Sequence, residues 1–463
     1  MAKQNDNETG GLAMNRRGVL KCMAWAGTGV VWSMAGGIPR PFNLVDPAAA
    51  AAGFSFVQIS DSHIGFDKPA NPNVAGTLQE TIDKVKALPT PPAFMLHTGD
   101  ITHLAKPAQF DNADQIIKGA NLQVHYVPGE HDVIDDDGKG YRERYGKGTM
   151  GTGWYSFDAG GVHFIGLVNV MGFKAGGLGN LGQEQIAWFE QDVKGLAAST
   201  PIVVFAHMPL WTIYADWGWG TGDAAQALAL VKRFGSVTVL NGHIHQIVQK
   251  VEGNITFQTA RSTAYPQPEA GKAKAPGPLA VPADQLKKML GLRAITYAEG
   301  AHPLAISDAM LASGLPRFAG RNRRHLEHPE IEMPGMPIDH GRPRGAQFSP
   351  CLRRPTLLAA ALVGLCLVGA PLLAGSSRAA AAPNTIEISN FSFAPAVLTV
   401  PVGTTVTWVN DDDEPHTVVE SDTLFKSHAL DTGDKFSFTF TTSGKFQYFC
   451  TIHAHMVGTV VVE

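Results

Sequence analysis

The sequence predicts two folded domains of different class: an α/β sandwich over residues 53–314 and an all-β Greek-key sandwich over residues 383–463. The first prediction rests on short apolar runs that alternate with amphipathic helical stretches. The second rests on alternating apolar and polar residues with Gly and Pro turns, as at 397–409 and 435–440. A length of 463 residues, 44% apolar and 17% charged, is ordinary for a multidomain globular chain.

The amino terminus is expected to direct export. Residues 15–21 read Asn-Arg-Arg-Gly-Val-Leu-Lys and precede a mildly apolar run to about residue 37, with an alanine tract at 48–52. This pattern resembles a twin-arginine signal, so residues 1–52 are interpreted as a signal segment and the protein as periplasmic. The alternative is a basic turn before a short core helix.

A second leader-like segment lies at residues 351–382, after a linker at 315–350. Arg353 and Arg354 precede a run at 356–375 that is nearly all apolar, and about 18 apolar residues can just span a bilayer. A spanning helix would leave these arginines outside, against the positive-inside tendency. Two hypotheses stay open: a former signal peptide between two fused exported polypeptides, or an uncleaved membrane anchor.

The charge distribution limits the partners. The net charge of −4 argues against a nucleic-acid binder, and from residue 383 onward ten Asp and Glu face three Lys and no Arg. A protein that docks on this part is therefore expected to present a basic docking face.

Candidate ligand side chains follow each of five predicted strands. The strands are predicted at 54–60, 94–98, 124–128, 202–206 and 237–241, with helices at 77–88, 108–119, 183–196 and 223–234. Directly after the strands come Asp61 and His63, then Asp100, then Glu130 and His131, then His207, and last His243 and His245. Strand ends are where α/β sheets place their ligand crevices.

The spacing suggests how these side chains converge. Residues i and i+2 of an extended segment point the same way, so Asp61 with His63, and His243 with His245, are each expected to present two ligand atoms together. Glycines 99, 129 and 242 are expected to let the backbone turn tightly. Asp100 is the natural bridge, because two cations roughly 3.5–4 Å apart need a shared anion.

This series resembles the calcineurin-like metallophosphoesterases, which share a four-layer α/β sandwich. The stretch at 154–167 and residues 183–189 are similar to the branch of cyclic-nucleotide phosphodiesterases and purple-acid-phosphatase-like enzymes. The resemblance implies that Asp61, His63 and His245 bind one metal, that Asp100 bridges, and that Glu130, His207 and His243 bind the second. It implies His131 as catalytic proton donor to the leaving oxygen or as a phosphoryl clamp. His97, His125 and His163 are interpreted as structural, and His103 as close enough to Asp100 to support the centre from behind.

Glu130 departs from the family pattern, which has Asn at this position. A neutral amide is replaced by a negative charge, so two divalent ions and three carboxylates carry about +1 instead of about +2. The metals are expected to be Fe, Mn or Zn, and a mixed Fe(III)/M(II) pair would restore the charge. The activity implied is hydrolysis of a phosphomono- or phosphodiester by a hydroxide that two metals activate.

The last fourteen residues predict a mononuclear copper centre. Cys450, His453 and Met456 form a Cys-x-x-His-x-x-Met run, and His416 lies upstream. One thiolate, two imidazoles and a weak thioether suit both oxidation states of copper. Cys22, Cys351 and Cys366 lie in or beside leader-like stretches, so no disulfide framework is expected and Cys450 is interpreted as a ligand.

The copper motif is similar to that of small type-1 cupredoxins of the plastocyanin and amicyanin kind, which implies His416, Cys450, His453 and axial Met456 as ligands. The whole chain is therefore interpreted as an exported phosphoesterase joined to a blue-copper electron-transfer module. The alternative is a copper-binding redox module whose phosphoesterase-like part is a weakly active or inactive scaffold, which Glu130 would permit.

Overall fold

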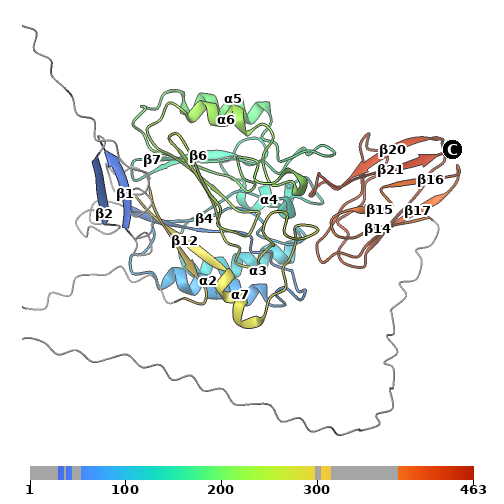
Figure 1. The fold of residues 1–463 in the computed structure, drawn as a ribbon, viewed down its shortest axis with the longest axis horizontal. Helices are drawn as coiled ribbons and strands as arrows, with labels where there is room; N and C mark the ends of the chain where they lie inside the picture. The colour runs from blue at the N-terminus through green and yellow to red at the C-terminus, as the bar shows by residue number, and fades with distance from the viewer. Residues whose placement is uncertain (1–29, 36–37, 44–53, 298–303, 314–383) are drawn as a thin grey trace, which may run out of the picture. The chain divides into compact units, whose positions relative to one another are not determined.

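The computed structural model describes residues 30–35, 38–43, 54–297, 304–313 and 384–463 (Figure 1). Strands β1 (Val30–Ala35) and β2 (Ile38–Asn43) form an antiparallel pair. The arginine pair at 16–17 and the apolar segment at 351–382 lie outside the described residues. Among the helices that are described, none combines the length and apolar character that a membrane span requires.

The first sheet of the α/β domain has five strands in the order β13-β12-β3-β4-β5. Its strands β3, β4 and β5 are parallel, whereas β12 and β13 add antiparallel strands at one side. The bounds are β3 (Phe54–Ile59), β4 (Met95–His97), β5 (Val124–Tyr126), β12 (Gly291–Tyr297) and β13 (Ala305–Met310).

The second sheet has six strands in the order β10-β11-β9-β8-β7-β6. Strands β7, β8, β9 and β11 are parallel, and the antiparallel strands β6 and β10 form the edges. The bounds are β6 (Tyr155–Ala159), β7 (Val162–Gly166), β8 (Ile202–Phe205), β9 (Val237–Asn241), β10 (Gln249–Glu252) and β11 (Ile255–Thr259).

The helices of this domain are α2 (Val74–Lys86), α3 (Pro107–Ile117), α4 (Lys139–Tyr145), α5 (Gln183–Lys194), α6 (Ala224–Val231) and α7 (Ala283–Met289). Helices α2 and α3 pack against the first sheet, and α5 and α6 pack against the second, which gives the predicted four layers. Short 3-10 turns complete the domain: η2 (Lys118–Ala120), η3 (Glu130–Asp132) and η4 (Ala215–Trp217).

Each helix pair buries its apolar stripe on its own sheet. Leu78 and Ile82 of α2 join Phe110 of α3 in one core with β3 and β4, while α5 and α6 share another core with β7, β8 and β9. A third core, rich in Phe, lies between the sheets, where Phe56 meets Phe164 edge-on at 5.2 Å. Because both faces of the central strands are buried, a strand such as β8 reads as a continuous apolar run.

The carboxy-terminal domain is an all-β sandwich of two four-stranded sheets, as predicted. The sheet orders are β15-β14-β17-β19 and β16-β21-β20-β18. The bounds are β14 (Thr385–Ile388), β15 (Phe393–Ala394), β16 (Val397–Val400), β17 (Thr405–Asn410), β18 (Val419–Glu420), β19 (Lys435–Thr439), β20 (Gly444–Phe449) and β21 (Val457–Val462). Trp408 and Tyr448 fill its centre, with ring centroids 5.2 Å apart.

Candidate metal centres

The structure brings all seven predicted dinuclear-site side chains to one buried place at the strand ends. Asp61 and His63 follow β3, Asp100 follows β4, and Glu130 opens η3 after β5. His207 follows β8 of the second sheet, and His243 and His245 follow β9. The site therefore lies where the carboxyl ends of two different sheets meet.

The ligand atoms fall into two groups with Asp100 between them. Asp61, His63 and His245 form one group, in which the Nε2 atoms of His63 and His245 are 3.2 Å apart. Glu130, His207 and His243 form the other; the Glu130 carboxylate lies 2.9 Å from His207 Nε2 and 2.8 Å from His243 Nδ1.

Asp100 spans the two groups with a single oxygen. Its Oδ2 is 3.6 Å from His63 Nε2 and 3.2 Å from His207 Nε2. This is the position that a bridging carboxylate requires.

The donors suit metal ions better than they suit one another. His207 Nδ1 donates to the carbonyl of Thr98 at 2.7 Å, and His245 Nδ1 donates to that of Tyr265 at 2.6 Å. Because neutral imidazole carries one proton, each Nε2 then presents a lone pair to the centre. Among the described residues, buried Asp61 Oδ2 has no hydrogen-bond partner, and Glu130 Oε2 and His207 Nε2 lie 2.9 Å apart without a hydrogen bond between them. Unpaired acceptors that converge in a buried place fit a pair of cations.

The ligand side chains converge because of a backbone conformation that differs from the extended segments that we expected. Asp61, His63, Asp100, His243 and His245 all have positive φ, between 41° and 70°. They account for five of the eleven such non-glycine residues in the described part of the chain. Left-handed turns, not extended pairs, aim these side chains, and strain of this kind concentrates at functional sites.

Close packing explains all three glycines. A Cβ on Gly129 would collide with the Asp100 carboxylate, and one on Gly242 would collide with the Ser60 hydroxyl. A Cβ on Gly99 would collide with the His207 ring, and Gly99 also has a φ of 95°, which favours glycine. These glycines let the backbone lie close to neighbouring groups of the centre.

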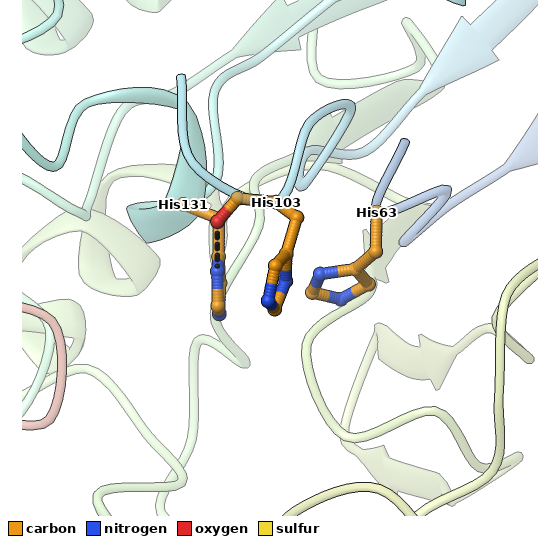
Figure 2. Close-up of side chains that lie close together, drawn as sticks. All are labelled: His63, His103 and His131. Atoms are coloured by element: carbon orange, nitrogen blue, oxygen red, sulfur yellow. Dashed lines mark hydrogen bonds between the residues drawn. The ribbon is translucent and has the colours of Figure 1, made fainter. Parts of the chain in front are cut away.

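His131 lies at the edge of the first ligand group, beside His63 and His103 (Figure 2). Its Nδ1 donates to the carbonyl of His103 at 2.9 Å, which fixes the ring and leaves Nε2 facing outward from that bond. Burial opposes protonation of His131, but Asp100, Glu414 and Glu130 raise its pKa to about 9. Asp132 accepts hydrogen bonds from the backbone N–H groups of Ile101 and Thr102 and so holds the loop in place. The His131 ring is oriented by the His103 carbonyl.

The surrounding charges shift the pKa values of the ligands. Burial would raise the pKa of Glu130, but His243 and His207 hold it well below its ordinary value. Burial, together with His131 and His245, lowers the pKa of His63 well below its usual range. Glu130 and His63 thus favour the deprotonated forms that bind metals. Burial opposes protonation of His207, but Asp100 and Glu130 raise its pKa well above its usual range.

The copper ligands also converge. Residues 450–456 connect β20 to β21, and His416 lies between β17 and β18. Cys450 Sγ is 3.8 Å from Nδ1 of both His416 and His453, and these two nitrogens are 3.1 Å apart. Met456 is buried in the same core cluster as Cys450. A thiolate and two imidazole nitrogens around one point fit a trigonal copper site.

Two supporting contacts of the copper centre were not predicted. The Asp412 carboxylate lies 3.0 Å from His416 Nε2, which leaves Nδ1 to face the sulfur, and Thr417 N–H donates to Cys450 Sγ at 3.4 Å. Burial alone would raise the pKa of the Cys450 thiol, but contact with His416 lowers it. The acidic run at 411–414 just before His416 was the sequence signal for Asp412.

Comparison with known proteins decides the families. Residues 54–247 match the calcineurin-like phosphoesterase model, and residues 359–462 match the cupredoxin-like domain model. The chain joins a calcineurin-like phosphoesterase domain to a cupredoxin domain. The cupredoxin match begins at residue 359, inside the apolar segment that the structure does not describe.

Relatives of both domains are found. Amicyanin of Paracoccus denitrificans is 36% identical over 83 residues, 17% of this chain and 63% of that protein. Plastocyanin of Tetradesmus obliquus is 33% identical over 104 residues, 20% of this chain and 72% of that protein. A 3',5'-cyclic-nucleotide phosphodiesterase of Nostoc sp. is 24% identical over 174 residues, 37% of this chain and 62% of that protein. The chain thus spans less than two thirds of the first and the last of these relatives.

Proposed function

We propose that the phosphoesterase domain hydrolyses phosphomono- or phosphodiesters at a dinuclear metal centre. The observation that supports this most is the place of Asp100 Oδ2, within 3.6 Å of a nitrogen from each ligand group. Asp61, His63 and His245 would hold one metal, and Glu130, His207 and His243 the other. When bound, such a pair supplies an acidified water and positive charge at the phosphoryl oxygens.

His131 is proposed as the proton donor to the leaving oxygen. Its Nδ1 is engaged by the His103 carbonyl, so Nε2 is the atom that can exchange a proton with a bound ester. The carbonyls of Thr98 and Tyr265 keep the His207 and His245 rings in the tautomer that the ligand role needs. These contacts are made by the protein alone and hold the site in place before substrate arrives.

Charge supports a proposal for the identity of the metals. Glu130 contacts both His207 and His243, so its carboxylate would belong to the second metal position and would lower the charge of the centre. We propose a mixed Fe(III)/M(II) pair, because a trivalent ion compensates for this carboxylate. Metal analysis that finds two divalent ions in a fast enzyme would contradict it.

For the cupredoxin domain we propose one copper ion and electron transfer with a protein that presents a basic face. The twin-arginine-like start of the chain supports a periplasmic location, where a copper carrier and a phosphoesterase would act side by side. Mass spectrometry of the mature protein tests both leader-like segments, since a new amino terminus near residue 382 would exclude the anchor.

A second candidate keeps the copper module and makes the phosphoesterase domain a weakly active scaffold. Glu130 favours it, because a less positive centre holds phosphate more weakly and acidifies water less.

Hydrolysis of bis-p-nitrophenyl phosphate by the metal-loaded full chain separates the two candidates. Asp100→Asn should remove bound metal and activity together, whereas Asp83→Asn, an exposed change on α2, should remove neither. Stoichiometric metal without turnover would favour the scaffold.

A further inference from the structure

The acidic loop that leads to the copper ligand His416 also reaches the phosphoesterase centre. Both domains belong to one compact unit, and Glu414, two residues before His416, is only 3% exposed. Its Oε1 accepts a hydrogen bond from the Tyr265 hydroxyl at 2.6 Å. Its Oε2 lies 3.7 Å from His131 Nε2 and has no hydrogen-bond partner within the described part of the chain.

The groups around this carboxylate are parts of the hydrolytic centre. Tyr265 packs on His63, with ring centroids 4.8 Å apart, and its carbonyl orients His245. His131 is the proposed proton donor, and His103 presents Nδ1 at 3.8 Å from the same Glu414 oxygen. Glu414 therefore offers an anionic oxygen to the atoms that an ester oxygen would approach.

Contacts on either side of Glu414 support the arrangement. Ile134, which follows η3, packs in the core cluster of the cupredoxin domain. The Asp135 carboxylate accepts from the Ala429 N–H at 2.6 Å, and Lys68 lies 3.6 Å from Asp431. The Asn410 side chain donates to the Glu414 carbonyl at 2.8 Å, so the acidic loop is itself held in shape.

The remaining space is too small for a substrate. A cavity lined by His63, His131, Tyr265 and Glu414, and by the copper ligand His453, has a volume of about 20 Å³. That is room for about one water molecule. A phosphoester cannot contact His131 from this side while Glu414 is in place.

We propose that Glu414 occupies the oxoanion position of the phosphoesterase centre, so that the copper loop closes this centre. Carboxylate and phosphate compete for the same donors, Tyr265 Oη and His131 Nε2, and an oxoanion binds only when Glu414 withdraws. If the closed form is populated about nine times in ten, the apparent affinity for phosphate falls about tenfold. The inference rests on the proposed metal centre and requires no turnover.

The test is calorimetric titration of inorganic phosphate into the metal-loaded full chain. Glu414→Gln should bind phosphate about tenfold more tightly than the natural chain, because the amide carries no charge to compete. Asp413→Asn removes the same charge from an exposed neighbour in the same loop and should change nothing. Equal or weaker phosphate binding by Glu414→Gln would overturn the proposal.

A second variant guards against misfolding of the first. Tyr265→Phe keeps the aromatic ring on His63 but removes the hydroxyl that holds Glu414, and should also tighten phosphate binding. Unchanged binding in a copper-replete Tyr265→Phe protein counts against the proposal. If the variants bind phosphate more tightly but never hydrolyse bis-p-nitrophenyl phosphate, the closure by Glu414 is supported and the proposed hydrolysis is contradicted. If the protein hydrolyses this ester but all variants bind phosphate equally, the hydrolysis is supported and the closure is contradicted.

Discussion

The two metal centres of this chain are built in opposite ways. Three of the four copper ligands come from residues 450–456, one connection between neighbouring strands of a small sandwich. The dinuclear ligands are spread from residue 61 to residue 245 and follow five strands of two sheets. A local site depends on one loop and its two flanking strands, whereas a dispersed site depends on the packing of a whole domain.

The largest effect that tests whether the two centres bind their metals independently is expected from Cys450→Ser. Serine cannot supply the thiolate that gives blue copper its intense absorption, so the visible band should vanish completely. The metals of the phosphoesterase domain should remain, because no dinuclear ligand lies in residues 450–456. Visible spectroscopy together with metal analysis checks both, and loss of all metals would show that the centres are not separable.

The reciprocal change is His131→Asn. If His131 protonates the leaving oxygen, kcat should fall about 10²- to 10⁴-fold, because general acid catalysis contributes that much. The copper spectrum should stay intact, since His131 is not a copper ligand. The fall in kcat should be smaller for esters with a very acidic leaving alcohol, because such an alcohol leaves without a proton. An equal fall in kcat for all esters would indicate that His131 is a phosphoryl clamp instead.

A smaller effect is expected from the carboxylate behind the copper ligand. Asp412→Asn replaces the anionic acceptor that orients His416 by a neutral amide and should weaken copper binding about 10- to 100-fold. Competition with a copper chelator measures this, and exposed Asp413→Asn is the matched control. Equal affinities for the two variants would mean that His416 is oriented by the backbone bonds of its loop alone.

The smallest effect concerns stability and pH. His163 lies between Asp158 and Asp192; burial opposes its protonation, but the hydrogen bonds to both carboxylates raise its pKa above 6.5. A group whose pKa is higher in the folded than in the unfolded state stabilises the fold fully when the pH is below its unfolded-state pKa. This stabilisation is lost as the pH rises through the folded-state pKa. His163→Gln should therefore cost at most about 1 kcal/mol below about pH 6 and less at alkaline pH.

Unfolding curves at several pH values would show this difference. His125 is the matched control, because its ring stacks on Phe157 at 3.7 Å and burial lowers its pKa to about 4. A His125→Gln change should have the same cost throughout the neutral and alkaline range. A pH-independent cost for His163→Gln would contradict the ion-pair interpretation.

Much of the fold and both ligand sets could be predicted because strong local patterns mark them. The five site strands and four helices lie close to their expected ranges, since buried parallel strands and amphipathic helices have distinct apolar periods. Strands β12 and β13 could not be predicted in the same way, because β12 joins the sheet through antiparallel pairing with β3, more than two hundred positions earlier, and β13 joins it through β12.

The sequence by itself determined the chemistry of this protein: which residues can bind metals, which strands they follow, and that one centre suits copper while the other suits two harder ions. Only the tertiary structure decided how those residues are aimed, through left-handed turns at Asp61, Asp100 and His243, and what lies against them. Glu414 meets Tyr265 across a separation of 149 positions. No periodic or motif signal encodes such a contact, because it arises only when two separately folded surfaces pack together.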